Sequence, residues 1–120
     1  NTLALAYDNK VDLYCLKRFK ITRRIKCDND PFAIEFFEHL ILIGDLKGVV
    51  TVFNNITGKI ELKKEIFQHE IDNIKYLRNS EFALSSMNGL YFVTLEKSSK
   101  GIDLKLSDEA YMQGNDIIFQ

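Results

Sequence analysis

Apolar and polar residues alternate along most of the chain, and short turns containing glycine, asparagine or aspartate interrupt the alternation. A tight turn followed by an alternating apolar strand recurs three times, at residues 8–14, 46–53 and 87–93. Val11, Val49 and Leu90 hold equivalent positions, which gives spacings of 38 and 41 residues. Because a fixed period of this size is typical of repeat architectures, we expect a repeated β-sheet unit.

We expect four short strands in each unit, and strand-like segments of the first unit lie at residues 3–7, 11–16 and 19–26. The first segment is almost entirely apolar, which predicts a buried strand. In the third segment, period-two alternation places Phe19, Ile21 and Ile25 on one face. The same alternation places the polar residues on the other face: Lys20, Thr22, Arg24 and Lys26.

The second and third units each contain four such segments, and the last segment is the most polar each time. They cover residues 32–36, 40–43, 49–53 and 60–66, then 71–77, 82–86, 90–95 and 102–106, with a loop at 97–101. The gradient predicts a four-stranded sheet with its first strand near a central axis and its last at the rim. We therefore divide the chain into units at 1–28, 29–67 and 68–106. Residues 107–120, strand-like at 111–119, begin a further unit.

Residues 43–54 resemble the core of a WD40 repeat. Phe53-Asn54 stands where that family has its Trp-Asp pair, and Thr57-Gly58-Lys59 matches the turn that commonly follows the pair. Gln68-His69 stands where the family often has Gly-His. The resemblance covers essentially the whole chain. It implies an all-β fold of antiparallel β-propeller blades.

The chain also departs from the WD40 pattern. It contains no tryptophan, and Lys47 occupies the turn position where the family favours aspartate. Thr94 stands at the tryptophan position of the third unit, so His69 lacks the aromatic end of the family's hydrogen-bonded tetrad. The resemblance therefore implies a divergent propeller without an intact tetrad.

Blade number limits how the ring can close. Propellers have roughly 4–8 blades of about 40–45 residues, so 120 residues supply about three. We expect a partial ring, either a fragment of a longer protein or a segment completed by other subunits. Its end blades would leave apolar faces open, so we do not expect a self-sufficient monomer. The alternative fold is a small closed β-sandwich or barrel.

Composition narrows the functional classes. The 16 basic and 17 acidic residues nearly balance, which gives no general attraction to nucleic acid or acidic membranes. Two cysteines make neither a disulfide framework nor a metal site, and they favour reduced thiols. No apolar run approaches the roughly 20 residues that a membrane-spanning helix needs, and no signal peptide is visible. We expect an intracellular protein, cytoplasmic or nuclear.

One basic cluster interrupts this balanced charge, and it lies within residues 17–26. Its members could contact phosphates of a nucleic acid or of an anionic lipid. The alternative is an outer strand with a solvated basic face. The candidate anion-binding residues are Lys17, Arg18, Lys20, Arg23, Arg24 and Lys26.

No catalytic, cofactor-binding or metal site is predicted. His39 and His69 have no second ligand at metal-binding spacing, and the serines at 85–86 lack a nucleophile elbow. The carboxylate pairs Asp28/Asp30 and Asp108/Glu109 lie in polar loops.

The leading hypothesis is a non-enzymatic scaffold for protein–protein interaction, with protein partners or further blades of the same propeller. The alternative is nucleic-acid or anionic-lipid binding through residues 17–26. The adjacent aromatic residues at 36–37 and 91–92 should each place one ring in the core and one against a neighbouring blade or partner.

Overall fold

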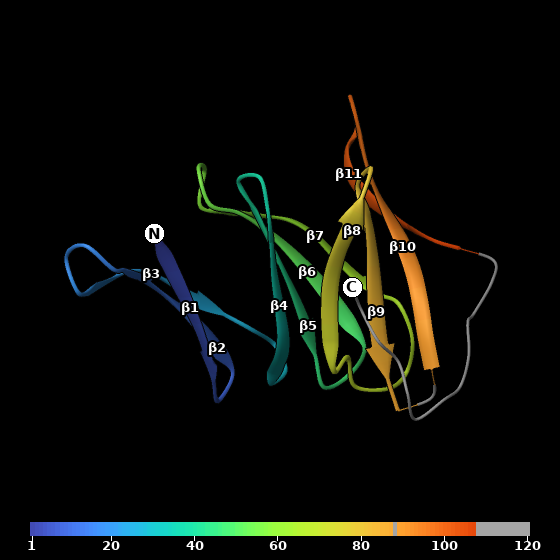
Figure 1. The fold of residues 1–120 in the computed structure, drawn as a ribbon, viewed down its shortest axis with the longest axis horizontal. Helices are drawn as coiled ribbons and strands as arrows, with labels where there is room; N and C mark the ends of the chain where they lie inside the picture. Colours follow the sequence, from blue (N-terminus) through green and yellow to red (C-terminus); the bar gives the residue numbers. More distant parts are fainter. Residues whose placement is uncertain (88, 108–120) are drawn as a thin grey trace.

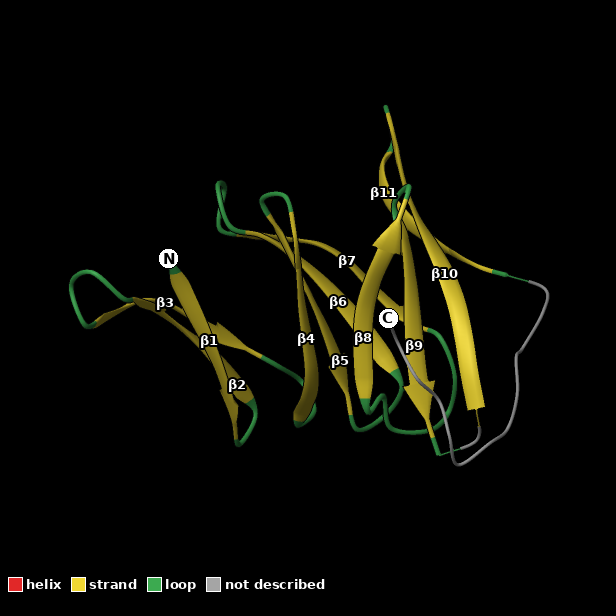
Figure 2. Cartoon of the chain, in the orientation of Figure 1, coloured by secondary structure: helices red, strands yellow, loops and turns green. Residues whose placement is uncertain are grey.

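The computed structural model describes residues 1–87 and 89–107, which form β-strands joined by turns (Figures 1 and 2). The first sheet has the order β1 (Thr2–Tyr7), β2 (Lys10–Cys15), β3 (Lys20–Lys26). The second sheet has the order β4 (Pro31–Phe37), β5 (Leu40–Asp45), β6 (Val49–Asn54), β7 (Lys59–Glu65). The third sheet has the order β8 (Asn73–Arg78), β9 (Glu81–Ser86), β10 (Gly89–Ser98), β11 (Gly101–Leu106).

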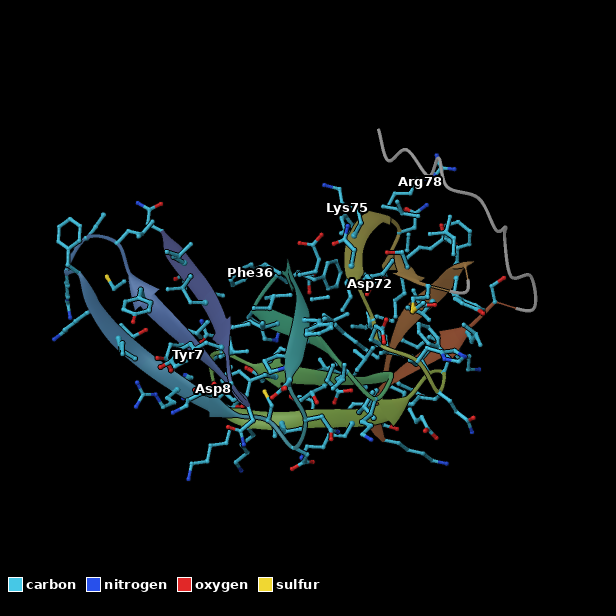
Figure 3. The ribbon with its side chains drawn as sticks, turned by 90° about the horizontal axis from the view of Figure 1, so that it is seen from below. Tyr7, Asp8, Phe36, Asp72, Lys75 and Arg78 are labelled. Atoms are coloured by element: carbon cyan, nitrogen blue, oxygen red, sulfur yellow. The ribbon has the colours of Figure 1, made fainter. Side chains whose placement is uncertain are left out.

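The three sheets stack in chain order. β4 contacts both β1 and β8, whereas β7 contacts β11. The first strand of each sheet therefore lies along one side of the stack. The last strands of the second and third sheets lie together on the other side. Figure 3 shows Phe36 of β4 with Lys75 and Arg78 of β8 on the first of these sides. The second and third sheets have their four strands in chain order, as predicted.

Two apolar cores hold the sheets together. Leu42 and Val52 of the second sheet pack with Phe82 and Leu84 of the third sheet. The first and second sheets share a smaller core. Its fully or nearly buried members are Val11, Leu13, Ile25, Ile41, Ile43 and Phe53. Because the second sheet is covered on both faces, every residue of β5 is buried.

The first sheet matches only the last three strands of the second sheet. The pairing of β2 with β3 shifts between Leu13 and Tyr14, and the pairing of β6 with β7 shifts between Val52 and Phe53. Because both pairings shift at the same place, β2 and β3 correspond to β6 and β7. β1, which pairs with β2, therefore corresponds to β5, which pairs with β6. Among the described residues, no strand of the first sheet corresponds to β4. The predicted plan of four strands per unit is wrong for this unit.

The predicted burial of the first strand is also wrong. Leu3 and Leu5 are each 44% exposed and Tyr7 is 40% exposed. Alternation directs Ala4 toward the second sheet, whereas Leu3 and Leu5 point to the opposite face. No described strand covers that face.

The predicted alternation in β3 fails at its beginning. Ile21 pairs with Tyr14 and Arg24 pairs with Asp12, so Ile21 and Arg24 share a face. The cause is a bulge at Thr22, which shifts the alternation by one residue. Phe19 lies before β3 in a turn, with a φ of 53°.

Other predictions have mixed outcomes. The loop expected at 97–101 is shorter, because β10 continues to Ser98 and β11 begins at Gly101. The closed sandwich or barrel is wrong, because the described strands form three separate open sheets. The strand expected at 111–119 and Asn88 of the third turn lie outside the described residues. Over 1–87 and 89–107, no helix has the length and apolar character needed to cross a membrane.

Candidate interaction surfaces

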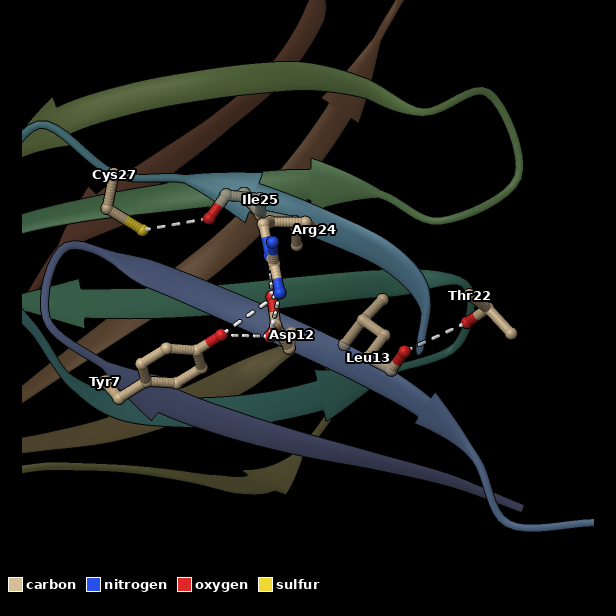
Figure 4. A network of polar contacts seen from close by, with 7 residues as sticks. All are labelled: Tyr7, Asp12, Leu13, Thr22, Arg24, Ile25 and Cys27. Carbon is tan, nitrogen blue, oxygen red and sulfur yellow. Dashed lines mark hydrogen bonds and ion pairs between the residues drawn. The ribbon is translucent and has the colours of Figure 1, made fainter. Parts of the chain in front are cut away.

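A polar network lies on the uncovered face of the first sheet (Figure 4). Strand register places Asp12 between Leu5 of β1 and Arg24 of β3. The Asp12 side chain is fully buried, and it accepts hydrogen bonds from Arg24 Nε at 2.7 Å and Arg24 Nη2 at 3.0 Å. The Tyr7 hydroxyl also donates to Asp12. The carboxylate is therefore held by both neighbouring strands.

These contacts keep the network charged. The Arg24 guanidinium, followed by the Tyr7 hydroxyl, lowers the pKa of Asp12 from 3.8 to about 2. The hydrogen bond to Asp12 raises the pKa of Arg24, and a hydrogen bond to the same carboxylate raises the pKa of Tyr7. Asp12 and Arg24 therefore form a permanent ion pair at neutral pH, and this pair joins β2 to β3.

The open face, as we name it, consists of this network and the apolar residues around it: Leu3, Leu5, Tyr14 and Ile21. A groove of about 430 Å³ crosses one end of it and is lined by Leu3, Leu5, Tyr14, Cys15, Leu16 and Phe19. The equivalent residues of the second sheet, Ile41, Ile43 and Phe53, are only 1%, 2% and 5% exposed, because the first sheet covers them. The open face thus carries apolar residues at the positions that are buried by a neighbouring sheet in the second sheet.

Two of the predicted anion-binding residues have structural contacts instead. Arg23 faces the second sheet, where its Nε and Nη2 donate to Oδ1 and the carbonyl of Asn55 at 3.2 and 3.3 Å. Its guanidinium also lies 5.5 Å from the centre of the Phe53 ring. Arg24 points to the opposite face, toward Asp12. The basic segment therefore presents no single face of arginines.

The remaining four predicted cations are exposed, and they lie at opposite ends of β3. Lys26 lies opposite Lys10 at one end of the strand, near the β1–β2 turn. Lys17 and Arg18 lie in the β2–β3 turn at the other end, and Lys20 begins β3 there. Only these last three form a compact basic group.

The residues considered for catalysis and metal binding are dispersed. Over 1–87 and 89–107, no group of three or more His, Cys, Asp or Glu side chains could hold a metal ion. Asp28 pairs with Lys63 at 2.7 Å on the surface. His69 is exposed and His39 is half-buried in the β4–β5 turn. The pair Asp108/Glu109 lies outside the described residues.

In each of the adjacent aromatic pairs at 36–37 and 91–92, one ring packs against another aromatic ring. The ring centre of Phe37 lies 5.1 Å from Tyr76 and 5.4 Å from Phe82, both of the third sheet. Phe36 points to the other face and is 41% exposed. Tyr91 stacks on Phe67 with ring centres 4.8 Å apart.

Sequence reasoning missed the two buried polar residues that organise the turns of the second sheet. Asp45 accepts the backbone N–H groups of Lys47 and Val49 at 2.9 and 3.0 Å. Asn54 accepts those of Ile56 and Thr57 at 2.9 and 3.1 Å. An Asp or Asn directly before a turn is the signal that could have identified both, because these side chains bond to the backbone that follows.

Comparisons with known proteins identify the fold but no family. No family model matches the sequence, and no curated protein matches it. The crystal structure of the Myceliophteria thermophila Cps50 (Swd1) β-propeller domain superposes with a TM-score of 0.71 at 12% identity over 88% of this chain. A chain of the mitotic checkpoint complex superposes with a TM-score of 0.72 at 11% identity over 85% of this chain.

The chain spans 35% and 32% of those two chains. Identities this low show the fold alone. The sheets are blades of a β-propeller, as the sequence predicted, and they do not close into a ring.

Proposed function

We propose that this chain is part of a larger β-propeller that acts as a non-enzymatic scaffold for protein–protein interaction, within a longer protein or a multi-subunit complex. The open face carries the proposal, because it repeats the apolar pattern that is buried on the second sheet. Exposed apolar patches of this kind mark surfaces that another protein element covers. A further blade of the same propeller fits this face.

Two other observations support the proposal. The solved chains that share the fold are roughly two and a half times as long, and one of them belongs to the mitotic checkpoint complex. Over 1–87 and 89–107, the His, Cys, Asp and Glu side chains form no group of three or more that could hold a metal ion. We infer protein partners, no cofactor, and a location in the cytoplasm or nucleus. The two free cysteines are compatible with a reducing compartment.

Cross-linking mass spectrometry on nuclease-treated protein from its native source tests the scaffold role. We expect a stoichiometric protein partner that is cross-linked to lysines of this chain. The double variant Lys17→Glu, Lys20→Glu should retain the same partner, since a scaffold does not depend on the basic turn.

The choice of variant follows from the structure. Reversing Arg23 or Arg24 would disturb packing, because both side chains have structural contacts. Loss of the partner in the double variant, or the absence of any stoichiometric partner, would contradict the proposed scaffold.

A further inference from the structure

We propose that the segment directly preceding Asn1 in the natural chain forms a fourth strand beside β1 and completes the first sheet. We name this strand the inner strand. It would run antiparallel to β1 and stack on β4, as β4 stacks on β8. The inference rests on the proposed function, since it treats residues 1–120 as part of a larger propeller. It adds which edge is filled and which segment fills it.

The free edge of β1 is the first observation behind this proposal. In the described structure β1 pairs only with β2. The N–H of Leu16 donates to the Asn1 carbonyl at 3.1 Å, so the odd-numbered residues of β1 direct their backbone groups toward β2. Thr2, Ala4 and Ala6 therefore direct their N–H and C=O groups away from β2. An edge of this kind is a template for pairing with another strand.

The second sheet shows what fills the corresponding edge. β1 corresponds to β5, and the register places Thr2 at the position of Leu40. On its other side β5 pairs with β4 through the residues that correspond to Thr2, Ala4 and Ala6. These residues are Leu40, Leu42 and Gly44. The backbone groups left free on β1 are thus the ones that β5 uses to hold β4.

A backbone contact of Asn1 identifies the segment that would supply the inner strand. The Asn1 carbonyl accepts the N–H of Leu16 at 3.1 Å. In the second sheet, the His39 carbonyl accepts the N–H of Asn55 at 2.9 Å. His39 is the second residue of the two-residue turn that joins β4 to β5, so Asn1 holds the place of the last residue of such a turn. Residues before it would run back along the free edge of β1, as β4 runs along β5.

The exposed ring of Phe36 on β4 is the second, independent observation. Phe36 shares a face with Ile34, which packs against the core between the first and second sheets. Phe36 is nevertheless 41% exposed, because no described strand of the first sheet holds the position that would lie over this part of β4. The inner strand would lie there and cover the ring.

The next interface in the stack predicts which residue would cover Phe36. Tyr76 of β8 corresponds to Phe36, because each pairs with the second residue of the strand that follows. Tyr76 is half-buried, and the Phe37 ring of β4 lies over it with ring centres 5.1 Å apart. Phe37 stands two residues before His39. We therefore expect a large apolar residue two positions before Asn1, packed on the Phe36 ring.

The connection to Asn1 favours this segment over another polypeptide. Any extended strand could bond to the free groups of β1. A second copy of the chain or a partner protein would first lose its translational and rotational freedom. A segment joined by a two-residue turn is held at the edge at only a small cost of loop closure. The two sources therefore differ in how pairing depends on concentration.

Amide hydrogen exchange, read at single residues by NMR on the natural full-length chain purified alone, tests the proposal. The N–H groups of Ala4 and Ala6 should exchange at least roughly a hundredfold more slowly than those of Lys63 and Glu65. The control residues lie in β7, where the N–H of Ile66 donates to the β5–β6 turn at 2.8 Å. Alternation then directs the N–H groups of Lys63 and Glu65 to the rim edge of the sheet, which a neighbouring blade leaves free.

The dependence on concentration identifies the strand's source. Slow exchange at Ala4 and Ala6 should persist in the monomeric chain at every dilution. Slow exchange that is lost on dilution would assign the edge to a second copy, and slow exchange only after a partner is added would assign it to another protein. Either outcome would overturn the proposal, as would Ala4 and Ala6 exchanging as fast as Lys63 and Glu65.

A pair of variants tests the cover over Phe36 separately. Phe36 and Ile60 are 41% and 42% exposed in the described structure, and the inner strand would cover only Phe36. Phe36→Asp should therefore lower the urea midpoint of the natural chain far more than Ile60→Asp, because only the first carboxylate would be buried. Equal shifts of the two midpoints would contradict the inner strand.

Failure of this inference can be told apart from failure of the proposed function. Maleimide labelling of Leu5→Cys, with Cys15 and Cys27 replaced by serine, reports whether a blade covers the open face. It does not report whether a strand pairs with β1. Slow labelling together with fast exchange at Ala4 and Ala6 would reject the inner strand alone. Fast labelling would count against the larger propeller itself.

Discussion

At the residue scale, Asp12 shows how a charge is accommodated inside this fold. A buried carboxylate is costly unless its oxygens are satisfied. Arg24 and Tyr7 supply those hydrogen bonds from the strands on either side. The sequence shows an acidic residue in a strand and an arginine in the next, but it does not show their register. From the sequence alone, Arg24 therefore groups with the phosphate-binding candidates.

Asp12→Asn should destabilise the protein and change its response to acid. The folded pKa of Asp12 lies below its ordinary value of 3.8. Its contribution to stability is therefore complete above that value and is lost as the pH falls toward about 2. Urea unfolding across this range should show a smaller acid-dependent loss of stability in Asp12→Asn than in the native protein.

An exposed pair provides the control for this experiment. Glu96 and Lys105 form an ion pair at 3.3 Å with side chains 48% and 66% exposed. Because surface pairs contribute little, Glu96→Gln should be nearly neutral. Equal effects of Asp12→Asn and Glu96→Gln would show that the buried network does not contribute as described.

At the scale of elements, the turns decide how strands join. Sequence patterns located nearly all the described strands, because alternation and turn residues are local signals. They missed the bulge at Thr22, which depends on pairing with β2. They also missed that one strand precedes the recurring turn of the first unit, whereas two precede it in the others. Counting strands from that turn would have identified the first sheet as incomplete.

Gly48→Ala should be severely destabilising. Gly48 has a φ of 82°, and an added Cβ would lie 1.7 Å from the carbonyl oxygen of Phe67. The link between β7 and β8 crosses this turn, and the N–H of Ile66 donates to the Gly48 carbonyl at 2.8 Å. Overpacking and backbone strain together should cost roughly 3 kcal/mol or more in urea unfolding.

Gly101→Ala separates backbone strain from the steric clash. Gly101 also has a positive φ, of 117°, but no atom lies within 4 Å of an added Cβ. The substitution should cost only the conformational strain, about 1 kcal/mol. If the two alanine variants unfold at the same urea concentration, the steric clash with the Phe67 carbonyl is not the cause of the destabilisation by Gly48→Ala.

At the scale of the whole molecule, the open face is the feature that leaves the fold incomplete. The repeat period and the blade count predicted a partial propeller, and the stacked sheets agree with it. Which apolar residues would remain uncovered could not be derived locally. Leu3 and Leu5 are exposed because no described sheet covers their face of the first sheet. Their own apolar segment predicts a buried strand.

Leu3→Asp distinguishes a covered face from a free one. In the described structure Leu3 is 44% exposed and pairs with Tyr14, so a carboxylate there would be tolerated if the face were free. A blade on the open face would bury that carboxylate. We then expect the free energy of unfolding of the natural chain to fall by at least roughly 2 kcal/mol. Ile56→Asp, at a tip that is 75% exposed, should be nearly neutral. Thermal unfolding of the two variants side by side gives the comparison, and equal melting temperatures would count against a covered face.

The most direct test of the partial propeller measures thiol reactivity at Leu5 in the natural chain. Leu5→Cys and Ile56→Cys are compared in a background where Cys15 and Cys27 are serine. Maleimide labelling should be far slower at position 5 than at position 56, because a further blade covers the open face, whereas Ile56 is 75% exposed in a sheet that is already covered. Labelling at similar rates at the two positions would contradict the account.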